Sequence, residues 1–214
     1  VANTTGDGLT AVGSQALQAN TTGDDNVAIG GYSASTDTYA SMYANTTGSN
    51  NTAVGVGSLR TSTTGIENVA IGYQAMHANT TANYNTAVGA YAGDGITTGT
   101  HNVCVGYNAG SQTNILTTGG DNVFLGNYAS GSATSAGGEI AIGYNVQTVG
   151  NNQITVGRGA NTASLGLDGS DTSWAAASSD ERLKENIETS TAGLALINDL
   201  RPVTYNWKKA KDVP

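Results

Sequence analysis

Side chains that could hold a metal ion or act on a substrate are few and scattered in this chain. The two histidines, His77 and His101, have no further ligand at the spacing that a metal site requires. Cys104 is the single cysteine, so no internal disulfide can form, and it occupies a position that alanine fills in most repeats. The sequence therefore predicts no metal ion and no cofactor, and it predicts a packed structural role for Cys104.

Carboxylates are also poorly placed for catalysis. Cleavage of a glycosidic bond needs two carboxyl groups that flank the bond. Only isolated acidic residues such as Asp24, Asp25 and Asp94 are visible in the repeats. An enzyme that depolymerises surface sugars is therefore the least supported of the functions that this sequence suggests.

Binding chemistry is more plausible in the places where the repeat is interrupted. The longest insertion, STDTYASMY at 35–43, carries Tyr39, Met42 and Tyr43. Exposed tyrosines among small polar residues suit sugar stacking or protein contact, so these three residues are the predicted binding residues. The alternative is that Tyr39 and Tyr43 pack against a neighbouring coil or protomer. Shorter insertions lie at 111–116 and 130–138.

The elements that carry these insertions are short repeats. Ten strand-like pentamers end in glycine, and the final glycines are spaced by 17, 25, 17, 17, 17, 20, 17, 14 and 9 residues. A unit of this length cannot enclose a core alone and must stack on its neighbours. The sequence predicts an all-β fold, a parallel β-solenoid of about ten coils. The final, or motif, glycines are Gly13, Gly30, Gly55, Gly72, Gly89, Gly106, Gly126, Gly143, Gly157 and Gly166.

Alternation along each pentamer separates two faces. In NVAIG, Val27 and Ile29 share one face and Ala28 lies on the other. We expect the branched aliphatics to form a ladder inside each protomer. The small alanine face would then allow close approach of sister chains in a homotrimer.

Residues around the pentamer predict how the coils are joined. Asparagine recurs four residues before the motif glycine and predicts a side-chain amide ladder between coils. A second glycine usually stands seven residues before the motif glycine, often within Thr-Thr-Gly, and predicts a corner with positive φ. Tyrosines one or two residues after several motif glycines predict an aromatic row along the shaft.

Charge divides the chain near its C-terminal end. The net charge is −8, yet residues 1–171 contain two basic and ten acidic side chains, whereas residues 179–214 contain six of each. This shift predicts a repeat shaft at 1–170, a linker at 171–178 and a second domain at 179–214. The repeats have no basic patch for nucleic acid and no apolar run long enough for membrane insertion.

The C-terminal segment has a different pattern from the repeats. Ser178 and Glu181 fit a helix-capping box, and a helix ending near Leu200 is followed by a short strand, so a small α+β unit is expected. The motif SDERLK begins at Ser179, and LRPVTYNW follows at 200–207. Together they resemble the intramolecular chaperone domain of endosialidase type, the S74 peptidase family, which ends phage tail spikes and fibres. The coils are similar to the head repeats of trimeric adhesins and to phage fibre shafts.

The resemblance implies a folding role and one reaction. The domain would help three chains assemble and then cut itself off beside Ser179–Asp180, with Ser179 as nucleophile and Lys184 as base. Such a lysine needs burial or a nearby cation to lower its pKa. The alternative makes Ser179 a helix cap and Lys184 a solvated charge.

These observations predict a trimeric phage tail fibre or spike that attaches to a host. Its partners would be two sister chains, a glycan or protein receptor on the host surface and other virion tail proteins. Its location would be the virion or the extracellular space. The alternative is a bacterial surface fibre or adhesin, located on the cell surface and built from the same modules.

Overall fold

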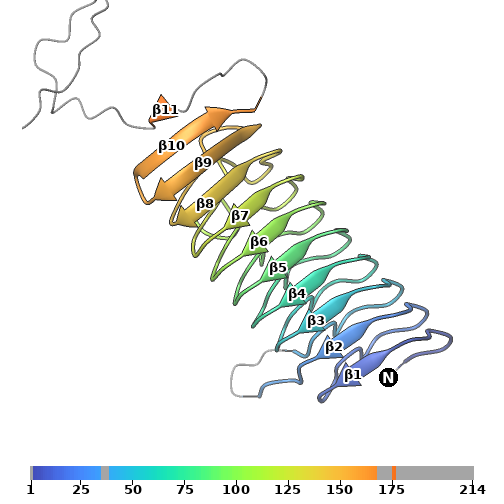
Figure 1. The fold of residues 1–214 in the computed structure, drawn as a ribbon. Coiled ribbons are helices and arrows are strands. Elements are labelled where there is room, and N and C mark those ends of the chain that lie inside the picture. The colour runs from blue at the N-terminus through green and yellow to red at the C-terminus, as the bar shows by residue number, and fades with distance from the viewer. Residues whose placement is uncertain (1, 35–38, 168–174, 177–214) are drawn as a thin grey trace, which may run out of the picture. The chain divides into compact units, whose positions relative to one another are not determined.

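The computed structural model describes residues 2–34, 39–167 and 175–176 and confirms the β-solenoid. Nine strands pair in parallel, each with the next in the sequence (Figure 1). No helix occurs among the described residues, and the predicted α+β segment lies outside them. The nine strands are β1 (Thr10–Val12), β2 (Val27–Ile29), β3 (Thr52–Val54), β4 (Val69–Ile71), β5 (Thr86–Val88), β6 (Val103–Val105), β7 (Val123–Leu125), β8 (Ile140–Tyr144) and β9 (Gln153–Arg158).

The tenth repeat does not form a coil, which corrects the predicted number to nine. β10 (Asn161–Gly166) runs antiparallel to β9, and β11 (Ala175–Ala176), inside the predicted linker, pairs antiparallel with β10. Only nine residues separate the last two motif glycines, against 17 in most coils, so the chain must reverse in a tight turn. The parallel stack therefore ends in a hairpin.

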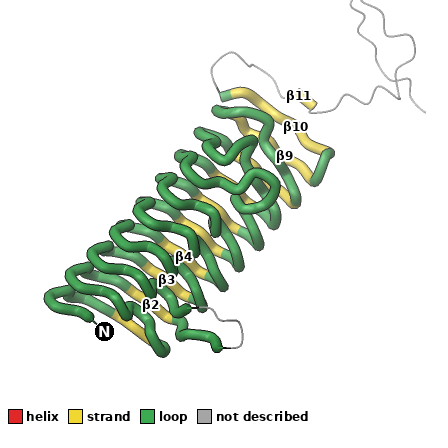
Figure 2. Tube along the Cα trace, turned by 180° about the vertical axis from the view of Figure 1, so that it is seen from behind, coloured by secondary structure: helices red, strands yellow, loops and turns green. Residues whose placement is uncertain are grey.

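Most of each coil is loop and turn (Figure 2). The backbone of one coil hydrogen-bonds to the next at the turns as well as the strands; for example, Thr63 N–H donates to the Thr80 carbonyl at 2.9 Å. In the strands, Ala70 lies opposite Ala87, and Ile71 opposite Val88. The coils therefore stay in register around their circumference.

The two strand faces have the opposite orientation from the one expected. Ala28, Ala53 and Ala70 are fully buried inside the coil, whereas Ile29 and Ile71 are 38% and 39% exposed. The prediction that the aliphatics point into each protomer was wrong. In most coils the strand therefore contributes only a small side chain to the interior.

The interior is filled from the side opposite the alanines. Leu17, Leu59 and Met76 are fully buried, and each has a left-handed backbone (φ 47° to 53°) four residues after a motif glycine. Where glycine takes that position at Gly110, a Cβ would come within 2.8 Å of Cys104 Sγ and 3.3 Å of the Phe124 ring. The glycine makes room for the larger Phe124 in the usual alanine position.

The predicted asparagine ladder is present and fully buried. Asn51 Oδ1 accepts from both the backbone N–H and the Nδ2 of Asn68, at 3.0 and 3.1 Å. The same pair of bonds joins each neighbour along the series Asn26, Asn51, Asn68, Asn85, Asn102 and Asn122. Glu139 ends the series, and its N–H donates to Asn122 Oδ1 at 2.9 Å.

The glycines at the two ends of the strand have different roles. The motif glycine Gly89 has φ +134°, a conformation that favours glycine strongly. Gly48, in a Thr-Thr-Gly turn, has no positive φ, which corrects the prediction for that corner. A Cβ on Gly48 would lie 2.3 Å from the Gly65 carbonyl oxygen of the next coil, so close stacking requires the glycine there.

Candidate functional site

A line of aliphatic side chains runs along the outer surface of the shaft, and we call this line the aliphatic stripe. Each of the nine parallel strands contributes one residue, and exposure reaches 54% at Val12 and 36–39% at five later positions. The stripe carries no charge. Its members are Val12, Ile29, Val54, Ile71, Val88, Val105, Leu125, Ile142 and Val156.

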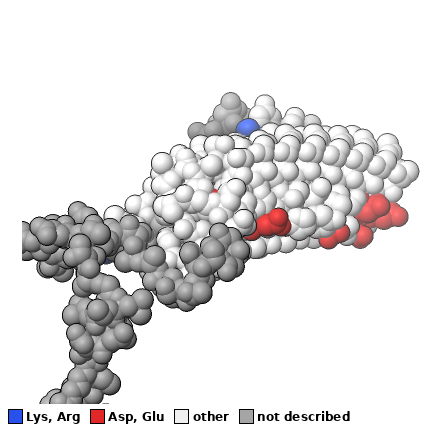
Figure 3. All heavy atoms as spheres, turned by 90° about the horizontal axis from the view of Figure 1, so that it is seen from above, with Lys and Arg blue, Asp and Glu red and all other residues white. Residues whose placement is uncertain are grey.

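The stripe is long for an exposed apolar surface. Nine coils stacked ~4.8 Å apart give the stripe a length of roughly 40 Å, and one side chain per coil, about 6 Å wide, gives an area of roughly 250 Å². Apolar patches of a few hundred Å² or more on a monomer commonly mark contact surfaces. Charged side chains are sparse on the face of the shaft in Figure 3, and acidic residues gather along one side of it. Because the stripe itself contains only aliphatic side chains, a neighbouring shaft could pack along it without burying a charge from the stripe.

A second feature is an aromatic cluster at the longest insertion. The rings of Tyr39 and Tyr43 lie 4.6 Å apart, and Tyr32 lies 5.9 Å from Tyr39. The guanidinium of Arg60 lies 5.9 Å from the centre of the Tyr39 ring, in cation–π range. Tyr39, Tyr43 and Arg60 line a small cleft of 290 Å³. This surface has both a flat aromatic face and a positive charge.

Met42 does not belong to that surface. It is fully buried in the coil interior, with a left-handed φ of 48°. A ligand on the outside of the shaft would not reach it, so of the three predicted binding residues only Tyr39 and Tyr43 face the cleft. Met42 instead fills the interior as Leu59 and Met76 do in the following coils.

The predicted aromatic row is present over five coils. Tyr73, Tyr91, Tyr107, Tyr128 and Tyr144 form successive edge-to-face pairs with ring centres 5.3–6.1 Å apart. Arg158 lies 5.7 Å from the Tyr144 ring and ends the row. Such pairs contribute about 0.5–1.5 kcal/mol each beyond their burial. The row stabilises the coil edges.

Sequence reasoning did not single out Arg60 or Arg158. They are the two basic residues of positions 1–171, and each stacks on a tyrosine. Their rarity in an otherwise acidic shaft was the available signal. The pairing itself could not be predicted, because Arg60 and Tyr39 lie in different coils.

Titratable groups in the described coils are few. Burial lowers the pKa of His77, opposed by Asp94, whose carboxylate lies 3.7 Å from His77 Nδ1, while Arg60 lowers it further. Burial raises the pKa of Cys104 to about 12, so its thiol stays protonated and inert. No group of three or more metal-ligating His, Cys, Asp or Glu side chains is found in residues 2–34, 39–167 and 175–176.

The predicted self-cleavage residues Ser179 and Lys184 lie outside the described residues. The chain divides into two units after Ser178. The model of the peptidase S74 family, described as chaperone of endosialidase, matches residues 179–213. The C-terminal segment is thus similar to the chaperone of endosialidase family.

This match confirms the resemblance that the SDERLK and LRPVTYNW motifs indicate. It covers the short segment after the shaft, and no curated protein and no solved structure matches the chain. A search of the described coils finds no helix suited to crossing a membrane.

Proposed function

We propose that this chain is part of a homotrimeric fibre, a phage tail fibre or spike, in which the solenoid is the shaft and the C-terminal segment is the folding chaperone. The observation that carries the proposal is the match of residues 179–213 to the endosialidase chaperone family directly after a β-solenoid. A bacterial surface fibre built from the same modules is the alternative. The two differ in the other proteins with which the fibre assembles.

The aliphatic stripe supports self-association. Burying one branched side chain from water contributes roughly 1.5–3 kcal/mol when complete, and the stripe offers one such residue per coil over nine coils. A parallel arrangement of identical chains would place each residue of the stripe beside its own copy. Three chains around an axis would remove the whole stripe from water, and the resemblance of the coils to the repeats of trimeric adhesins is the reason for proposing that number.

The chaperone segment would act once in the life of each chain. We infer that it assists assembly and that Ser179 and Lys184 then release it. Lys184 would take the hydroxyl proton of Ser179, whose oxygen would attack the backbone carbonyl at the cut site, and Lys184 would return that proton to the leaving amine as the C–N bond breaks. Water, deprotonated by Lys184, would then hydrolyse the ester and restore the Ser179 hydroxyl. The cut would fall beside Ser179–Asp180.

Attachment to a host surface is the proposed role of the insertions. Tyr39 and Tyr43 offer aromatic faces beside the Arg60 guanidinium, a combination that stacks on sugar rings or on protein side chains. A fibre of this kind would act outside the cell, on the virion or on the bacterial surface. Tyr39→Ala and Tyr43→Ala should weaken adsorption to host cells without changing assembly.

Mass spectrometry of the full-length product beside Ser179→Ala tests the processing step. We expect loss of a C-terminal fragment only in the wild type. A second variant, Lys184→Met, separates the base from the nucleophile and should also remain uncut. Equal, uncut masses in all three proteins would refute self-cleavage. The proposed role of the solenoid as a trimeric shaft would then be tested by the mass of the assembly alone.

A further inference from the structure

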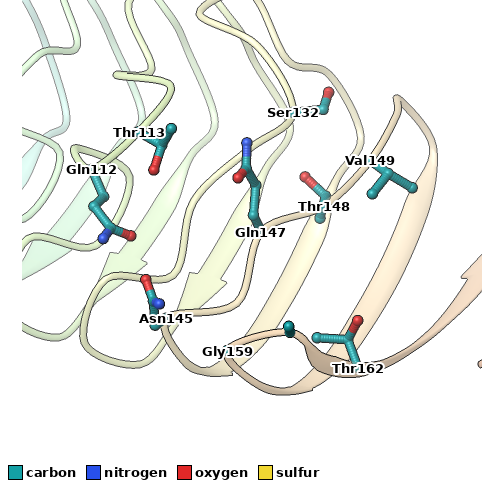
Figure 4. A pocket seen from close by; sticks show the side chains of 10 residues that line it. Gln112, Thr113, Ser132, Asn145, Gln147, Thr148, Val149, Gly159 and Thr162 are labelled. Atoms are coloured by element: carbon teal, nitrogen blue, oxygen red, sulfur yellow. The ribbon is translucent and has the colours of Figure 1, made fainter. Parts of the chain in front are cut away.

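We propose that a polar groove near the C-terminal end of the shaft binds a neutral oligosaccharide. This proposal deepens the attachment role proposed above and concerns a site separate from the Tyr39 cluster. The groove has a volume of 640 Å³, within the usual range for small-ligand sites. It brings together the insertions of two successive coils, 111–116 and 130–138, with the last coil and the turn between β9 and β10 (Figure 4).

Hydrogen bonds hold the walls of the groove in place. Asn114 Nδ2 donates to the carbonyls of Gly131 and Ser132 at 3.3 and 2.7 Å and so ties one insertion to the other. A parallel bridge joins Ser130 to Gln147 in the next coil. The groove is therefore built from backbone already fixed by its neighbours, and a ligand would not have to order it.

A buried carboxylate organises the hydroxyls of one wall. Glu139 is fully buried, and its side chain accepts hydrogen bonds from the Ser132 N–H at 2.8 Å and from the hydroxyls of Ser132 and Thr148. Since the Ser132 hydroxyl has a single proton to donate and is only half-buried, its lone pairs are left to accept bonds from a ligand, whereas the buried Thr148 supports the wall. Ser132 and Thr148 both line the groove.

The remaining lining determines the class of ligand. Gln112, Asn145 and Gln147 bring amides, which both donate and accept, as sugar hydroxyls do (Figure 4). Val149 and Ala160 offer apolar contact for the C–H faces of a sugar ring. None of the ten lining residues is charged, so the groove has nothing to neutralise a phosphate, sulfate or uronic acid.

A peptide fits the groove less well than a saccharide. Extended peptides commonly bind by adding a strand to an open sheet edge. Here β10, which supplies Thr162 to the groove, is already paired with β9 on one side and with β11 on the other. The groove can therefore recognise a ligand mainly through its side-chain amides and hydroxyls.

Binding of the full chain to a panel of immobilised oligosaccharides, neutral and anionic, tests the inference. We expect selective binding to neutral members, and titration of the best one should show about tenfold weaker binding for Gln112→Ala combined with Gln147→Ala. Ala160→Trp, a change at an exposed turn position, should fill the groove and abolish binding. Gln18→Ala, an exposed glutamine in the first coil, is the matched control and should bind as the wild type does.

The outcomes separate this inference from the proposed function. Three results would each refute saccharide binding in the groove. They are binding to no neutral oligosaccharide, a preference for anionic oligosaccharides, and equal binding by the wild type and Ala160→Trp. If these results came with normal adsorption to host cells, attachment would stand and lie elsewhere on the shaft. If Ala160→Trp changed the mass of the assembly, the groove would be a contact between copies of the chain, and the saccharide proposal would be wrong.

Discussion

Ser62→Asn should stabilise the shaft, because Ser62 interrupts a second buried ladder of asparagines ten residues before the motif glycines. In that ladder Asn45 Nδ2 donates to Asn20 Oδ1 at 2.7 Å and to the Gly48 carbonyl at 3.0 Å. The serine side chain is too short to continue it. As a result Asn45 Oδ1 and Ser62 Oγ are buried with no hydrogen-bond partner in the described structure.

The size of the effect follows from the groups that are left without partners. An unsatisfied buried polar atom costs about 1–3 kcal/mol, and a hydrogen bond that is made contributes about 0.5–1.5 kcal/mol net. Asparagine at 62 would donate to Asn45 Oδ1 and accept from Asn79 Nδ2, and fixing its side chain would offset part of that gain. We expect a net gain of about 1–2 kcal/mol, which for a domain of this size raises the melting temperature by roughly 2–8 °C.

Circular dichroism melting and amide hydrogen exchange provide the assay. In a solenoid each coil is coupled mainly to its neighbours, so added protection should centre on the coils around residue 62. Ser62→Asp is the matched control, since it has the shape of asparagine but places an acceptor opposite Asn45 Oδ1, and it should be destabilising. If Ser62→Asn melted no higher than the wild type, the reasoning about unsatisfied ladder atoms would be refuted.

Three further predictions concern the interior and its titratable groups. Phe124→Ala should cost about 3–5 kcal/mol, because Phe124 is among the largest fully buried side chains, and a loss under 1 kcal/mol in chemical denaturation would contradict its packing role. Cys104, with its pKa raised to about 12 by burial, should resist thiol reagents at pH 8 until the chain unfolds, and rapid labelling of the native protein would contradict its burial. Burial lowers the pKa of His77 in the folded state, so protonation favours unfolding; stability should be full above pH 6.5 and fall as the pH drops below it. Between pH 7.5 and 5 the melting temperature of His77→Gln should fall less than that of the wild type. An equal fall in both proteins would exclude His77 as a source of the pH dependence of stability.

The fold could be predicted from the sequence because its signals repeat. Glycine spacing indicated the solenoid, and the recurring asparagines indicated the amide ladder, which is buried as a ladder must be. The last repeat was predicted to be a coil because its pentamer fits the pattern, although its motif glycine follows the previous one after only a short spacing. Spacing sets the length of backbone available for a coil, and nine residues are too few.

The orientation of the strands could not be predicted from alternation alone. Period-two patterning shows that Ile71 and Val88 share a face, but it does not show which face is the interior. The deciding signal lay elsewhere in the repeat, in the large residues Leu17, Leu59 and Met76 that complement the alanines from the opposite side. Their left-handed backbone is unusual for large side chains and could not be predicted from the sequence.

The groove near the C-terminal end shows a similar limit. The insertions at 111–116 and 130–138 could be recognised in the sequence as departures from the repeat. Their contact in the folded shaft could not be predicted. Their meeting depends on stacking, which places residues 17 or 20 positions apart next to one another in successive coils. Glu139 was visible only as an exception to the asparagine series, and its role depends on Ser132 and Thr148.

The mass of the assembly in solution, measured by sedimentation equilibrium, tests the central claim most directly. We expect a trimer: the uncut Ser179→Ala protein at three times the 21.5 kDa chain mass, and the wild type at three times the mass of the shaft that remains after self-cleavage. Val88→Lys, which places a charge in the aliphatic stripe, should shift the protein to monomers with its β-structure retained, whereas Thr81→Lys, at an exposed turn position of the same coil, should leave the trimer intact. A wild-type monomer at micromolar concentration, or an assembly that Val88→Lys does not affect, would contradict the account.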